Sequence, residues 1–101
     1  MIYNKLVRDN IPDIIKQSGE TSVVHIAGDK EYGAKLKEKL EEEVGEFLKD
    51  DSKEELADIL EVIYAICDLH KIDLQELESL RRSKAEKRGA FKKRIILEET
   101  K

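Results

Sequence analysis

The 101-residue sequence predicts an all-α fold of four helices with two short extended segments. Long stretches place Leu, Ile and Val every three or four residues, which is the spacing of one helix face. Residues typical of helix ends separate these stretches. Apolar residues make up 40% of the chain and aromatic residues only 5%, a composition typical of a small helical core. The length indicates one domain over residues 1–101.

The first predicted helix follows a short N-terminal segment. Asp9 or Asn10 can cap it, and Pro12 lies in its first turn, where the missing N–H costs little. Gly19 ends it in the left-handed conformation that follows many helices. The β-branched run TSVVHIA at 21–27 then predicts a short strand.

The next two helices contain most of the acidic residues. One spans about 30–49 with Asp29 as its cap, and the other spans about 53–70. Ser52 caps the latter, and Glu55 stands three residues on, as in a capping box. We therefore expect a helical hairpin with a short polar turn.

The C-terminal part contains a similar set of helix start and stop signals. Asp73 and Glu76 begin a fourth helix over about 73–88, which Gly89 stops. A second short strand is expected at 94–97.

Charge and composition exclude several classes of protein. The net charge of -4 argues against a general nucleic-acid binder, which would be basic. No apolar run approaches the ~20 residues of a membrane span, so no membrane partner is expected. The single cysteine, Cys67, excludes an intrachain disulfide and stands in an apolar helical run. We expect a buried thiol and a cytoplasmic protein.

Two pairs of acidic residues stand beside apolar helix faces. Glu43 and Glu46 lie at the margin of the apolar stripe of the second helix, while Glu55 and Asp58 lie within and beside that of the third. An antiparallel hairpin turning at 50–52 sets Glu46 opposite Glu55 and Glu43 opposite Asp58. Four carboxylates would then converge on one helix–helix seam.

Four anions at a half-buried seam need compensation. Protonation or basic side chains can supply it, but hard oxygen ligands without a nearby His or Cys pair best suit Mg²⁺, with Mn²⁺ as a substitute. The alternative is ordinary helix chemistry, in which Glu55 closes the capping box and Glu46 pairs with a lysine.

The acidic motifs stand in a wider context that resembles a known family. They read Glu42-Glu43-Val44-Gly45-Glu46 and Glu55-Leu56-Ala57-Asp58. With YNKLVRDNIP, ELADILEVIYAI and KRGAFKKRIIL in order, the chain resembles the MazG-like all-α nucleoside triphosphate pyrophosphatases over nearly its whole length. It is most similar to their house-cleaning, phosphoribosyl-ATP pyrophosphohydrolase-like branch. Only eight residues separate the two motifs, a short gap for the superfamily that limits the pocket mouth.

The resemblance implies a Mg²⁺-dependent hydrolase that cuts nucleoside triphosphates between the α and β phosphates. The products would be a nucleoside monophosphate and pyrophosphate. It implies that Glu42 orients the attacking water or binds metal through water, and that the metal ligands are Glu43, Glu46, Glu55 and Asp58. It also implies a homodimer or higher homo-oligomer, in agreement with the nearly all-round apolar third helix, which one small chain can hardly cover.

Basic residues that could meet the substrate phosphates occur in two places. Lys84 and Arg88 continue the leucine face of the fourth helix and match the family's basic block, although C-terminal dipole charge also explains them. Lys5 and Arg8 lie in a block characteristic of the branch, and otherwise read as surface charges.

Two other functions stay open. One is true phosphoribosyl-ATP pyrophosphohydrolase activity in histidine synthesis. The acidic motifs cannot distinguish this activity from cleavage of nucleoside triphosphates. The other is a catalytically silent helical dimer that binds nucleotide or metal, against which the intact acids argue. No Ser-His or Cys-His constellation is evident, which favours direct attack by water.

Overall fold

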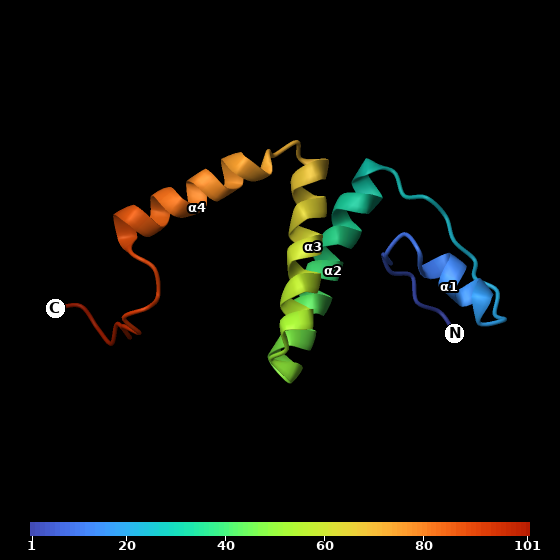
Figure 1. The fold of residues 1–101 in the computed structure, drawn as a ribbon, viewed down its shortest axis with the longest axis horizontal. Coiled ribbons are helices and arrows are strands. Elements are labelled where there is room, and N and C mark those ends of the chain that lie inside the picture. The colour runs from blue at the N-terminus through green and yellow to red at the C-terminus, as the bar shows by residue number, and fades with distance from the viewer. The chain divides into compact units, whose positions relative to one another are not determined.

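The computed structural model describes all 101 residues and contains four helices and no strand (Figure 1). The all-α prediction is therefore confirmed. The chain divides into two compact units, Met1–Lys71 and Ile72–Lys101. The first unit holds α1 (Ile11–Gln17), α2 (Asp29–Asp50) and α3 (Lys53–Leu69), and the second holds α4 (Leu74–Arg88).

Two of the predicted caps begin helices as expected. The Ser52 hydroxyl accepts a hydrogen bond from the Glu55 N–H at 3.4 Å at the start of α3. The Asp73 carboxylate accepts one from the Gln75 N–H at 2.8 Å at the start of α4. Each cap satisfies a backbone donor that the first helical turn leaves without a partner.

The predicted caps of the other two helices make no such bond. Asp29 is the first residue of α2, and Gly28 takes the cap position in an extended conformation. Asp29 therefore stands in the first turn, where its charge favours the positive end of the helix dipole. Asn10 precedes α1 without a side-chain cap, while Pro12 occupies the first turn as predicted.

The two predicted strands, at 21–27 and 94–97, are wrong, because neither segment forms a ladder. Their apolar side chains are exposed, with Val23 and Ile26 almost fully open and Ile95 and Ile96 largely so. A β-branched run becomes a strand only when a partner supplies backbone hydrogen bonds and a surface to pack against. Local propensity alone therefore leaves both segments irregular.

The helices α2 and α3 form the predicted hairpin and lie side by side (Figure 1). Asp51 ends α2 in the left-handed conformation, with φ 52° and ψ 28°, and donates its N–H to the Phe47 carbonyl at 2.8 Å. A short aspartate tolerates this conformation better than most residues. The chain reverses within Asp51 and Ser52, so the motifs on either side of the turn face each other.

The core of the hairpin is small. Only Leu36, Val62 and Cys67 are buried, at 1%, 7% and 4% exposure. The buried thiol confirms the expectation for Cys67. No helix combines the length and the apolar character needed to cross a membrane.

Substitution of Leu36 tests the position of this core. We expect Leu36→Ala to lower the free energy of unfolding by about 2–5 kcal/mol, because it removes a fully enclosed side chain and leaves a cavity. Leu97→Ala, the same change at 77% exposure, should cost less than about 0.5 kcal/mol. Chemical denaturation measures both, and equal losses would contradict a core centred on Leu36.

Candidate metal centre

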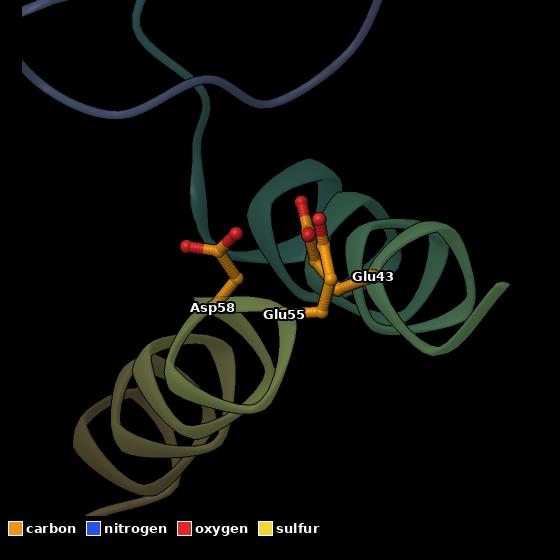
Figure 2. Close-up of side chains that lie close together, drawn as sticks. All are labelled: Glu43, Glu55 and Asp58. Atoms are coloured by element: carbon orange, nitrogen blue, oxygen red, sulfur yellow. The ribbon is translucent and has the colours of Figure 1, made fainter. Parts of the chain in front are cut away.

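Three carboxylates meet where α2 and α3 pack together. Glu43 from α2 and Glu55 and Asp58 from α3 each offer one oxygen, and these oxygens all lie within 4.8 Å of one another. All three residues are half-buried, and their side chains point to the same side of the helix pair (Figure 2). We call Glu43, Glu55 and Asp58 the acidic trio.

The hairpin itself brings the trio together. The Ser52 cap starts α3, which places Glu55 in the first turn and Asp58 almost one turn further along the same face. The αL turn at Asp51 folds this face against the side of α2 that carries Glu43. The predicted approach of Glu43 and Asp58 across the hairpin is confirmed.

Glu46, the fourth predicted ligand, lies outside the group of oxygens that share the 4.8 Å limit. It is half-buried on α2, one turn beyond Glu43. Its charge is near enough to contribute to the raised pKa of Glu55. Its part in metal binding stays a prediction.

The trio is under electrostatic strain. Partial burial, followed by the charges of Asp58 and Glu43, raises the pKa of Glu55 above its usual value. Both effects disfavour the ionised form, because burial removes solvating water and neighbouring anions repel it. A cation among these oxygens would relieve the repulsion.

Lysines stabilise the carboxylate of the neighbouring Glu42. Lys5 Nζ donates to Glu42 Oε1 at 3.0 Å, and Lys39 Nζ lies 3.5 Å from Glu42 Oε2. Partial burial opposes ionisation of this carboxyl, but the hydrogen bond from Lys5 and the charge of Lys39 lower its pKa. Lys39 also lies 3.4 Å from Glu43 Oε1.

Lys39 is a residue that the sequence reasoning missed. Its ammonium group bridges Glu42 and Glu43, three and four residues further along α2, and its side chain is largely covered. The spacing of Lys39 from Glu42 and Glu43 in the sequence could have indicated these contacts, because residues three and four apart are neighbours on a helix surface.

The two predicted N-terminal cations both reach acidic residues. Lys5 contacts Glu42 as described, and Arg8 Nη2 donates to Asp58 Oδ1 at 2.7 Å. Lys84 and Arg88 lie on α4 in the second unit and are exposed. Their contact with substrate stays a prediction.

A small hollow lies beside Glu42, between the N-terminal segment and α2. It has a volume of about 140 Å³ and includes three lysines and two glutamates, which gives its lining a net positive charge. Its lining consists of Lys5, Leu6, Lys35, Glu38, Lys39 and Glu42.

The donor set fits a hard divalent cation. The acidic trio offers only carboxylate oxygens, and no His or Cys belongs to the group. Such ligands suit Mg²⁺ and Mn²⁺ rather than softer metals. Three carboxylates also leave positions for water or phosphate, as is usual for protein-bound Mg²⁺.

No family model matches the chain, and no solved structure matches it. A curated relative from Mycolicibacterium smegmatis (strain ATCC 700084 / mc(2)155), an uncharacterized protein, is 46% identical over 50 residues. The match covers 50% of this chain and 51% of the relative, so the chain spans about half the length of the protein it matches.

Neutralising Glu55 tests the cost of burying its charge beside the other carboxylates of the trio. The folded-state pKa of Glu55 lies above its ordinary value of 4.5, so its ionised form destabilises the metal-free fold at neutral pH. This destabilisation decreases as the pH falls below the raised pKa of folded Glu55, and it is lost below the ordinary pKa of 4.5, where the carboxyl is protonated in both states. We expect Glu55→Gln to raise the Tm of the metal-free protein at neutral pH, and the gain to shrink as the pH is lowered.

The exposed neighbour Glu54, also in the first turn of α3, provides the matched control. Glu54→Gln removes the same charge away from the trio and should not raise the Tm. Thermal unfolding followed by circular dichroism across the pH range measures both. Equal effects, or a loss of stability in Glu55→Gln at neutral pH, would contradict a destabilising charge at Glu55.

Proposed function

We propose that this protein is a Mg²⁺-dependent nucleoside triphosphate pyrophosphohydrolase of the MazG-like type. It would cleave between the α and β phosphates and release a nucleoside monophosphate and pyrophosphate, with clearance of noncanonical nucleotides in the cytoplasm as its role. The observation that carries the proposal is the convergence of Glu43, Glu55 and Asp58. These residues come from the two acidic motifs of that family and meet in one place.

The acidic trio would hold the metal, with Glu46 beside it. When bound, a divalent cation offsets the charge of the phosphates and polarises the bond to be broken. Glu42 has a lowered pKa and so stays ionised near neutral pH. A carboxylate of this kind is a good hydrogen-bond acceptor but a weak base, which suits orientation of the attacking water better than removal of its proton.

Positive charge near the trio would serve the substrate. A nucleoside triphosphate is strongly anionic, and an acidic site alone repels it. Lys5 and Arg8 already stand within hydrogen-bonding distance of acidic residues at the site. Fixed cations at this position can stabilise the charge that develops on the phosphates during cleavage. Lys84 and Arg88 would add to this charge in the family arrangement.

The exposed apolar surface supports a homodimer or a larger homo-oligomer. Apolar side chains spaced four residues apart form one exposed stripe on α2 and another on α3. A second copy of the chain would cover them and complete the small core. The stripes consist of Val44 and Leu48 on α2 and of Leu56, Leu60 and Tyr64 on α3.

A product assay tests the proposed reaction. A panel of canonical and modified nucleoside triphosphates, with phosphoribosyl-ATP included, is incubated with Mg²⁺ and with EDTA. We expect Mg²⁺-dependent release of pyrophosphate and a nucleoside monophosphate. Turnover of phosphoribosyl-ATP alone would favour the histidine-synthesis function, and release of orthophosphate alone would contradict α–β cleavage.

Neutral isosteres test the role of the trio in the same assay. Glu43→Gln and Asp58→Asn should each lower kcat/KM by about 100-fold or more, a loss typical of removing a group that stabilises transition-state charge. Glu41→Gln makes the same change at an exposed position of α2 and should keep wild-type activity. Full activity in both trio variants would overturn the site assignment.

Sedimentation tests the assembly. We expect at least a dimeric mass at micromolar concentration, and we expect Leu60→Glu to shift it towards the monomer, because a charge would be buried against the partner. Leu97→Glu, at a more exposed leucine outside the stripes, should leave the mass unchanged. A monomeric wild-type protein would contradict the shared core.

A further inference from the structure

The N-terminal segment, residues 1–10, is tied to the hairpin by polar contacts. Lys35 Nζ on α2 donates to the Asn4 carbonyl at 2.7 Å. The next residue, Lys5, donates to Glu42 at 3.0 Å. Asn4 has a φ of 48°, a left-handed conformation that asparagine adopts more readily than most residues. The segment is thus held beside α2, the helix that carries the first acidic motif.

The same segment reaches the acidic trio itself. Arg8 Nη2 contacts Asp58 Oδ1 at 2.7 Å, the distance of a short charge-assisted hydrogen bond. Asp58 is one of the three carboxylates that would bind a cation. Arg8 therefore compensates part of the negative charge that a metal would otherwise compensate.

The Arg8–Asp58 ion pair is weak enough for a divalent cation to replace it. The side chains of Arg8 and Asp58 are 58% and 37% exposed, and ion pairs this open to water are weak. A divalent cation carries twice the charge and would contact all three carboxylates at once. Its charge would also repel a guanidinium held at the same aspartate.

We propose that the N-terminal segment is a strap whose contact with the acidic trio, through Arg8, a divalent cation displaces. In the metal-free protein Arg8 neutralises Asp58 while Lys5 neutralises Glu42. Cation binding releases Arg8 from Asp58 and leaves its guanidinium free to meet the phosphates of the substrate. The inference rests on the proposed function, because it requires the trio to bind a metal.

Metal affinity gives the first test. Mn²⁺ binding is measured by electron paramagnetic resonance on the full chain, without nucleotide. We expect Arg8→Gln to bind Mn²⁺ about two- to fivefold more tightly than wild type, because the metal no longer competes with an exposed ion pair. Arg8→Lys keeps the charge and should fall between the two.

A matched arginine in the second unit controls for the loss of charge. Arg81 contacts Glu78 at 2.6 Å and is 63% exposed, so Arg81→Gln removes a similar ion pair and the same charge. It should leave the Mn²⁺ affinity unchanged. Equal or weaker Mn²⁺ binding in Arg8→Gln, relative to wild type, would overturn the strap.

Release of the strap gives the second test, which does not depend on affinity. Trypsin cleaves after Arg8, and the ion pair of Arg8 with Asp58 hinders it. We expect saturating Mn²⁺ to speed cleavage after Arg8 several-fold, and Asp58→Asn to speed the same cleavage without metal. Cleavage after Arg82 in the second unit provides the internal control.

The outcomes separate the strap from the metal site. Mn²⁺ binding to wild type with unchanged or slower cleavage after Arg8 would overturn the strap and leave the metal centre standing. The absence of Mn²⁺ binding in wild type and in Arg8→Gln would overturn the proposed function together with the strap.

Discussion

The site depends on the repulsion between carboxylates that the α2–α3 hairpin forces together. A turn of two residues fixes the register of the helices, and this register sets Glu43 against Glu55 and Asp58. Helical packing thus partly buries these anions and holds them closer than they would lie in water, and both the burial and the neighbouring charges raise the pKa of Glu55. Within the chain only Arg8 and Lys39 offset the repulsion directly. A divalent cation would do so more completely, which links the geometry to the proposed chemistry.

The fold supports this site with little core of its own. Three buried residues stabilise the hairpin, and apolar side chains of α2 and α3 still face solvent. A protein of this size buries a smaller fraction of its surface on folding than a large protein does, so association is a natural way to gain stability. In the proposed account, the same hairpin therefore supplies the acidic trio and the surface for a second copy.

Much of the fold could be predicted from the sequence because its signals are local. Ser52 and Asp73 cap α3 and α4 through their own side chains, and the apolar spacing marks each helix. Local signals could not decide whether 21–27 and 94–97 form strands, because a strand needs a pairing partner and β-propensity does not supply one. Likewise, Asp29 resembles a cap by residue type, but the backbone places Gly28 in that position.

The trio was partly predictable for the same reason. Helical periodicity and turn length suffice to bring Glu43 and Asp58 together, but the positions of individual carboxylate oxygens decide that Glu55 joins them while Glu46 lies outside. The contacts of Lys5 and Arg8 span 37 and 50 residues along the chain, and no local pattern encodes such pairs. The resemblance marked these two residues, but their carboxylate partners became visible only in the structure.

The most direct test of the central claim is a crystal structure of the protein grown with Mn²⁺, measured at the manganese absorption edge. We expect an anomalous difference peak bounded by the carboxylates of Glu43, Glu55 and Asp58. Ordered carboxylates at these three residues without such a peak, in crystals saturated with Mn²⁺, would contradict it.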